Sequence, residues 1–443
     1  MKSNSPHYIP LREYLATVPI VDCHDHTLQC PPKPTNPLAH LIDGYIRSDL
    51  ESALDYRVVK ELAYKVGITT RDEISTKLAA LPLEETWRVV EPAWKRTKFT
   101  GYGLVVRKAL KEFYGEDDLT LEALQRIAPR MVDISDEKVF DSILEKAKIV
   151  VRLEDNWVDM KEFMAGKIKL PPRGRVMISL PGLHRMKTAA DIQVVGDEVG
   201  CTVTSLGEYL EVCREIFTGM KKAGAVGFKD QSAYERTLEY SNPTFAQAEE
   251  VFNWMMEDPR RSLSYPDGNK PLGDFLFHSF MRMARDLDLP VQIHTGHMAG
   301  IRNEIAKTNA VGLTRVLELH KETHFDLFHA NWPYSGELLF LVKNYPNVAL
   351  DFCWAHMIDP IYCQNLLKQA VSSVPHGKIH GYGSDLGGES VLNAWAHDDL
   401  ARDNIAVALT DLVDIDYIDL EEAKELAHNW LFYNPNQFFR LGL

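Results

Sequence analysis

At 443 residues, with 45% hydrophobic content, the chain is long enough for a large globular core. Its formal net charge of −14 argues against nucleic acid as a partner, and it has no apolar run long enough for a membrane helix. The six cysteines show no Cys-x-x-Cys spacing, and the first residues lack the apolar segment of a secretory signal. These features favour a cytoplasmic protein with reduced thiols.

Eight short apolar segments are predicted to be strands, most of them followed by a turn or a helical pattern. In chain order they cover 19–24, 148–153, 175–180, 225–229, 290–294, 325–329, 348–352 and 379–385. Helical periodicity lies between most pairs, for instance over 206–223, 244–257, 272–287 and 335–344. This alternation predicts a parallel sheet, and eight repeats favour its closure into a (β/α)8 barrel. A doubly wound open sheet is the competing architecture, but no Gly-x-Gly-x-x-Gly follows an early strand.

The alternation is interrupted between the first and second predicted strands. Helical patterns occur there over 50–66, 70–81, 84–99, 102–114, 121–131 and 137–146. We therefore predict a barrel formed by residues 1–34 and 147–443, with residues 35–146 as an inserted helical subdomain over the barrel mouth. Residues 419–443 are predicted to form a closing helix that packs Trp430 and Tyr433, among other aromatic residues, against the barrel.

Polar side chains stand at the ends of several predicted strands, where a parallel barrel builds its active site. They are His24 and His26, Lys229, His294, His329 and Asp385. Because residues two apart in a strand point to the same face, His24 and His26 should lie side by side. Imidazole and carboxylate groups are ligands of catalytic metal ions. The alternatives are a core histidine at position 294 and a helix N-cap at position 385.

The order His-x-His, Lys, His, His, Asp over successive strands resembles the amidohydrolase superfamily, as does the final Gly383-Ser384-Asp385. The resemblance implies a TIM barrel and a divalent metal, with zinc favoured and manganese as the alternative. His24, His26, His294 and Asp385 would hold this metal. Asp385 would also accept the proton of a metal-activated water, and His329 would be a ligand or polarise the substrate oxygen.

Lys229 leaves two metal arrangements open. In binuclear amidohydrolases a lysine at the end of the fourth strand is carboxylated and bridges two metals. The segment 227–236, however, resembles the uronate-isomerase-like and glutamine-synthetase-fused branch, in which this lysine would contact the substrate beside one metal. We favour the single metal and expect Lys229 to be a catalytic residue beside Asp385 and His329. The structural alternative is a lysine in a salt bridge at the barrel rim.

Further residues are expected to contact the substrate. They are Tyr234, Arg236, His297, Trp332, Trp354 and His356, together with Lys229. Arg236 is expected to clamp a carboxylate in bidentate fashion, with a surface salt bridge as the alternative. The segment that begins at His329 also resembles the uronate-isomerase-like branch, with Trp332 where tyrosine is common. For Trp354 and His356 the alternative is loop packing.

Together these features predict a metal-dependent hydrolase that attacks an amide, ester or lactone bond of a small, carboxylate-bearing substrate. The alternative is isomerisation of a uronate-type sugar acid, or decarboxylation, at the same metal site. A non-catalytic scaffold is disfavoured, because several converging polar groups without a role would be costly to bury. The expected partners are a small anionic substrate and further copies of the chain, with neither nucleic acid nor a membrane.

Overall fold

The computed structural model describes residues 3–26, 32–42, 44–54, 81–155, 158–386 and 390–443. At its centre is one sheet of eight parallel strands whose order in space is their order in the sequence. The strands are β1 (Ile20–Asp25), β2 (Ile149–Glu154), β3 (Gly174–Ser179), β4 (Gly227–Asp230), β5 (Val291–Ile293), β6 (Phe325–Leu327), β7 (Val348–Asp351) and β8 (Ile379–His380). All eight strands overlap predicted strand segments. The prediction succeeds because the strands of a parallel sheet covered on both faces are short runs of buried apolar residues, which can be recognised in the sequence.

The barrel closes between its last and first strands through the segment that follows β8. The amide of Cys23 donates to the carbonyl of Tyr382 at 3.2 Å, and the amide of Asp385 donates to the carbonyl of His24 at 2.8 Å. The carboxylate of Asp22 accepts hydrogen bonds from the amide and the hydroxyl of Ser384, at 2.8 and 2.6 Å. The eighth strand is therefore shorter than the predicted 379–385, but the predicted (β/α)8 barrel is confirmed.

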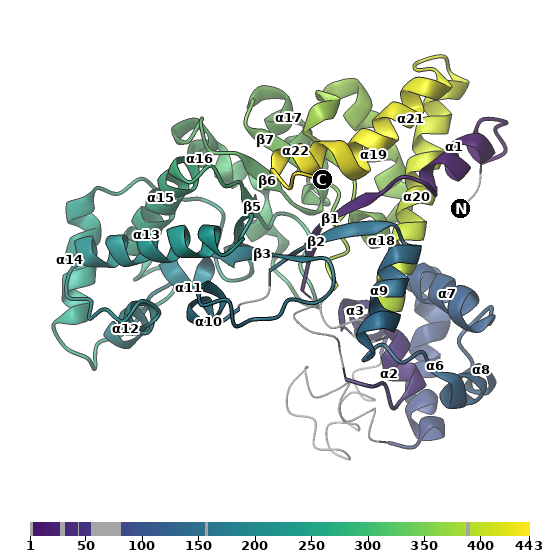
Figure 1. The fold of residues 1–443 in the computed structure, drawn as a ribbon, viewed down its shortest axis with the longest axis horizontal. Helices are drawn as coiled ribbons and strands as arrows, with labels where there is room; N and C mark the ends of the chain where they lie inside the picture. The colour runs from purple at the N-terminus through teal and green to yellow at the C-terminus, as the bar shows by residue number, and fades with distance from the viewer. Residues whose placement is uncertain (1–2, 27–31, 43, 55–80, 156–157, 387–389) are drawn as a thin grey trace.

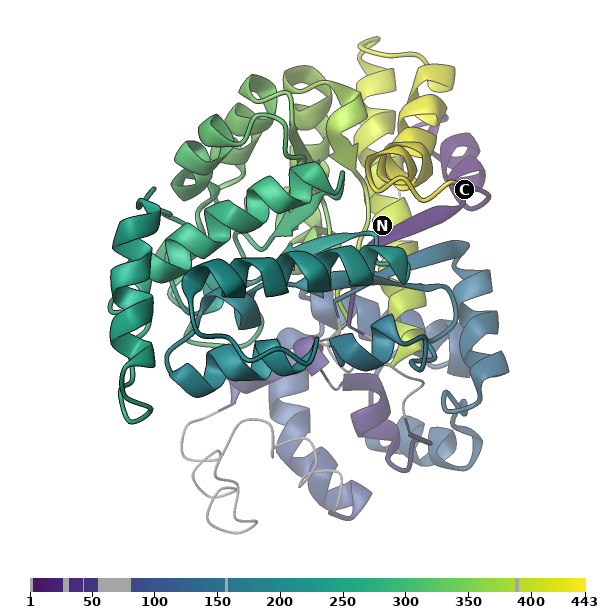
Figure 2. The same cartoon turned by 60° about the vertical axis from the view of Figure 1, so that its left-hand side comes forward.

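Helices surround the sheet (Figures 1 and 2). Those before β1 and after β2 are α1 (Tyr8–Leu15), α10 (Met160–Met164), α11 (Pro181–His184), α12 (Ala189–Asp197), α13 (Leu206–Lys222), α14 (Phe245–Met256), α15 (Lys270–Asp286), α16 (Thr314–Leu319), α17 (Ser335–Asn344), α18 (Ala355–Ile358), α19 (Pro360–Ser373), α20 (Val391–Asp414), α21 (Leu420–His428) and α22 (Asn434–Phe438). Sequence signals set several of their starts: Thr244, for example, forms a capping box with Gln247 ahead of α14. Among the described helices, none has the length and apolarity needed to cross a lipid bilayer.

Between β1 and β2 the described elements are all helical. The α-helices among them are α2 (Pro37–Ile42), α3 (Arg47–Ala53), α6 (Leu83–Thr97), α7 (Gly101–Tyr114), α8 (Leu121–Ile127) and α9 (Glu137–Lys146), and Figure 1 shows them gathered on one side of the barrel. Lys108 of α7 pairs with Asp399 and Asp403 of α20, at 2.5 and 2.9 Å. Most of the predicted helices 50–66 and 70–81 lies outside the described residues. The division into an inserted subdomain and a barrel stays a prediction.

The end of the chain packs against the barrel, as α21, a π-helical turn and α22 rather than as one uniform helix. Trp430 and Phe439 are buried there. The prediction that Tyr433 also packs inward is wrong, because its side chain is exposed.

Candidate metal centre

The two histidines at the end of β1 lie side by side, as their spacing predicts. The Nε2 atoms of His24 and His26 are 3.2 Å apart. Two nitrogens bound to one zinc at about 2.1 Å lie about 3.0–3.4 Å apart at bond angles between about 90° and tetrahedral. The observed spacing of the two nitrogens therefore fits two ligands of one ion, and it also lies within hydrogen-bond range.

The carboxylate of Asp385 joins this pair from the segment after β8. Its Oδ1 atom lies 3.2 Å from Nε2 of His26 and 3.6 Å from Nε2 of His24. The ligand atoms of these three residues all lie within 4.8 Å of one another. The N-cap alternative for Asp385 is wrong, because α20 begins at Val391 and the Ser390 side chain caps it.

The two later histidines complete the cluster. Nε2 of His329 is 3.5 Å from Oδ2 of Asp385 and 3.2 Å from Nδ1 of His294. The ends of β1, β5, β6 and β8 thus bring together the five side chains that the sequence suggests as ligands or acid–base groups. All but His26 are buried.

Backbone carbonyls orient three of the four rings. Nδ1 of His26 donates to the carbonyl of Asp155 at 2.7 Å, and Nδ1 of His329 donates to that of Cys353 at 3.0 Å. Nε2 of His294 donates to the carbonyl of His297 at 2.7 Å. In a neutral ring, the nitrogen that donates to the carbonyl holds the proton. The second ring nitrogen then carries a lone pair that faces the cluster. Hydrogen-bond acceptors behind metal-bound histidines orient those rings in the same way.

Burial keeps most of these rings neutral. It lowers the pKa of His24, His294 and His329 well below the usual value, and the positive charge of Lys229 adds to this effect. Burial acts in the same direction on His26, but hydrogen bonding to Asp385 and its negative charge raise the pKa of that ring to about 9. The neutral rings of His24, His294 and His329 therefore each carry a lone pair. The Asp385 carboxylate, which stabilises the protonated form of His26, would also stabilise a bound cation.

Burial alone would raise the pKa of Asp385. The hydrogen bond from His26 and the neighbouring positive groups outweigh it, so the pKa of this carboxyl lies below its usual range. Asp385 is therefore an anion at neutral pH. That is the state needed by a metal ligand and by a general base.

Lys229 reaches the same region from β4. The side chain is buried, and its Nζ lies 3.6 Å from the centre of the Phe328 ring. This amine has no hydrogen-bond partner among the described residues, so the rim salt bridge is not what the structure shows. Burial lowers its pKa, and the negative charges of Asp385 and Asp155 oppose that shift.

Four of the predicted substrate contacts lie beside the cluster. The Tyr234 ring is 4.8 Å from that of His294, and the Trp354 ring is 5.2 Å from that of His329. His297 packs between two tryptophans, with ring centres 4.8 Å from Trp354 and 5.5 Å from Trp332.

Two other predicted contacts are engaged in structural interactions. The buried Arg236 guanidinium pairs with Asp274 at 2.7 Å and donates to the carbonyls of Thr237 and Glu239. Its Nη1 has no hydrogen-bond partner among the described residues, and its role as a carboxylate clamp stays a prediction. Nε2 of His356 bonds to the carbonyl of Gly381 at 2.8 Å.

The other ring nitrogen of His356 faces Cys363 of α19 and Asn404 of α20. Both ring nitrogens of His356 thus face packing partners, and a contact of this side chain with substrate stays a prediction. The position of a residue after a strand does not reveal the direction in which its side chain turns.

Several residues of the site were missed in the sequence. Cys353 lies with His329 and Asp385 in a second group whose ligand atoms are within 4.8 Å of one another. Its position two residues after β7 is the signal that could have revealed it, since that strand end was otherwise without a candidate ligand. From the predicted insertion, the rings of Tyr45 and Tyr102 pack on Trp354 at 4.9 and 6.2 Å. No spacing in the sequence indicates that contact.

Three residues of this region have backbone conformations that non-glycine residues rarely adopt. His329, Trp354 and Asp385 have φ of 56°, 61° and 47°. Each such residue costs on the order of 1–3 kcal/mol and persists where the surroundings over-determine it, often at functional sites. Gly296 has φ of 68°, and a Cβ there would lie 2.5 Å from the carbonyl carbon of Asn331. Only glycine lets the β5 and β6 loops approach so closely.

The fold and the cluster define a (β/α)8-barrel protein with a candidate metal centre at the carboxyl ends of its strands. Residues 261–441 match the family described as amidohydrolase, which confirms the resemblance predicted from the sequence. Protein fluG of Emericella nidulans is 25% identical over 225 residues, which are 49% of this chain and 26% of that protein. The chain thus matches about a quarter of the length of this curated relative.

Solved structures share the fold over nearly the whole chain. Glucuronate isomerase from Caulobacter crescentus has a TM-score of 0.72 at 17% identity and covers 100% of this chain and 96% of its own. A Lactobacillus casei protein to which a metal-dependent hydrolase activity is ascribed has a TM-score of 0.63 at 18% identity, over 98% of both chains. At these identities the likeness is one of fold.

Proposed function

We propose that the protein is a metal-dependent hydrolase that cleaves an amide, ester or lactone bond of a small, carboxylate-bearing molecule. The convergence of His24, His26, His294, His329 and Asp385 carries this proposal. Such a set of inward lone pairs and one anion is unfavourable without a cation and suits zinc, with manganese as the alternative.

His24, His26, His294 and Asp385 would hold the ion. A bound divalent ion supplies Lewis acidity and lowers the pKa of water that it binds. In the chain itself, Asp385 is the acceptor for a proton, because its carboxylate is anionic and lies at the centre of the cluster. His329 lies 3.5 Å from that carboxylate, so it is placed either to complete the ligand set or to polarise a substrate oxygen.

The buried amine of Lys229 is an argument for an anionic substrate. Its amine is buried and has no hydrogen-bond partner among the described residues, which is costly until an anion arrives. A substrate carboxylate would provide that anion. In the binuclear alternative, carboxylation of the amine would provide it instead, and the lysine would bridge two ions.

Isomerisation of a uronate-type sugar acid is a second candidate. The glucuronate isomerase of Caulobacter crescentus shares the fold across all of this chain, and a sugar acid would offer both a carboxylate for Lys229 and oxygen atoms for the metal centre. Decarboxylation at the same site is a further variant of the non-hydrolytic alternative. We also propose that residues 35–146 form an inserted subdomain and that the protein is a homo-oligomer.

The test is a screen of metal-reconstituted protein against lactones, N-acyl acids, esters and uronates. Lactone or N-acyl acid hydrolysis that depends on the added metal is the expected result. Aldose-to-ketose conversion of a uronate without hydrolysis would replace the primary proposal with the isomerase. The matched control is His376→Asn, which changes an exposed histidine outside the cluster and should leave the rate unchanged.

A further inference from the structure

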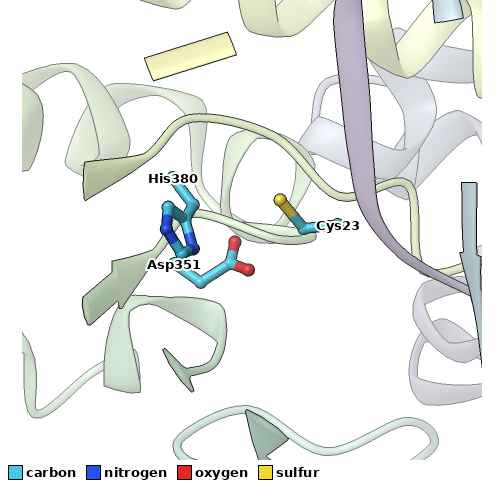
Figure 3. Close-up of side chains that lie close together, drawn as sticks. All are labelled: Cys23, Asp351 and His380. Carbon is cyan, nitrogen blue, oxygen red and sulfur yellow. The ribbon is translucent and has the colours of Figure 1, made fainter. Parts of the chain in front are cut away.

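A further group of metal-competent side chains, which shares no residue with the ligands proposed above, lies inside the barrel. Cys23 of β1, Asp351 of β7 and His380 of β8 offer ligand atoms that all lie within 4.8 Å of one another. Figure 3 shows the Asp351 carboxylate between the His380 ring and the Cys23 thiol. The relative exposure of each residue is 0%. We propose that these three residues form an internal site for a thiophilic divalent cation of the zinc class.

The histidine of this group is oriented as a metal ligand. Nδ1 of His380 lies 2.9 Å from Oδ1 of Asp326, so it donates to that carboxylate. The proton is thereby held on Nδ1, and Nε2 keeps its lone pair. Nε2 is buried and has no hydrogen-bond partner in the part of the chain that the structure describes. A carboxylate behind a histidine is the usual second shell of a zinc ligand.

Asp351 also has a carboxylate oxygen without a hydrogen-bond partner among the described residues. Its Oδ1 accepts from the amide of Cys353 at 2.6 Å, whereas its Oδ2 is buried without a hydrogen bond to a described residue. An unpaired buried carboxylate oxygen is costly, and it is conventionally satisfied by a donor or a cation. Two unsatisfied acceptor atoms thus belong to a cluster whose third member is a thiol.

The charge and softness of the donors select the ion. A thiolate, a carboxylate and a neutral imidazole together carry the charge that neutralises a divalent cation, and the Asp326 carboxylate behind His380 adds further negative charge that favours a cation. Thiolate with imidazole favours zinc, or cobalt as its probe, over magnesium or calcium. The main alternative is a metal-free network in which Asp351 stays protonated beside Asp326.

The place of the cluster suggests what the ion would do. β8 has two ladder residues, and the barrel closes to β1 through single backbone bonds beyond it. A cation held by β1, β7 and β8 would cross-link the strands at this closure. It would act as a structural ion, whose binding free energy contributes to folding. Because the site is buried, the ion would enter while the chain folds.

The experiment uses full-length protein produced in medium supplemented with cobalt. A thiolate bound to cobalt gives an intense charge-transfer absorption in the near ultraviolet, which imidazole and carboxylate ligands do not give. We expect this band in the wild type and its loss in Cys23→Ala, with about one equivalent less of cobalt. Cys213→Ala, which removes a buried thiol of α13, is the matched control and should keep the band.

Two comparisons keep the test decisive. If Cys23→Ala does not fold, His380→Gln retains the thiol and should still lose about one equivalent of cobalt. Cys353→Ala should keep the band, because that thiol lies in the Asp385 cluster instead. A wild type without the band, a band that persists in Cys23→Ala, or a band that disappears only in Cys353→Ala would each overturn the internal site. None of these results would remove the catalytic centre, whose ligands are different residues.

Discussion

Replacement of Asp385 by asparagine tests the proposed acid–base chemistry. Asparagine keeps the shape of the side chain and one acceptor oxygen but removes the negative charge. It is also tolerated in the left-handed conformation, so the φ of 47° at this position should not cause misfolding. The backbone bond from residue 385 to the carbonyl of His24 is unaffected by the change.

The structure sets the expected magnitude. The carboxylate lies 3.2–3.6 Å from the Nε2 atoms of His24, His26 and His329, and its pKa lies below the usual range. Loss of a general base at such a centre costs roughly 10²–10⁴ in rate, or about 3–5 kcal/mol of barrier. We therefore expect kcat to fall at least about 100-fold, while the three remaining proposed ligands retain metal.

The assay is steady-state turnover on the substrate found in the screen, together with metal content and thermal unfolding of the same preparations. Asp416→Asn is a matched control, because Asp416 is exposed and has a φ of 56°, yet lies outside the cluster. Turnover of Asp385→Asn within a few-fold of the wild type, on folded and metal-loaded protein, would refute the acid–base role of Asp385.

Three further predictions address residues outside the acid–base step. Lys229→Met should retain most of the metal and lose activity on carboxylate substrates; loss of about half the metal would instead support a bridging, carboxylated lysine. Arg236→Met should lower the free energy of unfolding by about 2 kcal/mol without raising the KM of the folded fraction, because buried Asp274 loses its arginine but keeps Lys270. For His40, burial lowers the pKa to about 4, so the unfolded chain is protonated first as the pH falls. Stability should decline between about pH 6.5 and 4, by at most about 3 kcal/mol, and less steeply in His40→Gln.

Each of these predictions has a contrary outcome. A raised KM in stable Arg236→Met protein would support the carboxylate clamp that the sequence suggested. Urea unfolding across pH would contradict the His40 argument if the wild type and His40→Gln lost stability in parallel. Retention of full activity by Lys229→Met would remove the amine from substrate binding.

The polar residues at the strand ends can be predicted from the sequence, because their positions depend on local sequence features. A run such as Val291–Ile293 indicates a buried strand, and the next residue, His294, then falls at the edge where the strands of a barrel end. His24 and His26 needed only the two-residue period of a strand. Helices such as α9 were located well because an N-cap aspartate and a regular apolar face mark them in the sequence.

The rest depended on contacts between distant residues. Nothing near Arg236 in the sequence reveals that Asp274, on α15, would neutralise its charge. Tyr45 and Tyr102 lie far from Trp354 in the sequence, and only the folded chain brings their rings together. The sequence does not single out Cys353, because one cysteine without a spaced partner resembles any buried thiol.

Elemental analysis of protein purified without chelator tests the metal centre most directly. The comparison is between the wild type and a His24→Ala/His26→Ala variant, with His376→Asn as the control for loss of an exposed histidine. We predict at least about one equivalent of zinc or manganese in the wild type and in the control, and about one equivalent less in the double variant. A wild type with fewer than about 0.2 equivalents that added metal does not restore, or a double variant with unchanged metal content, would contradict the metal centre.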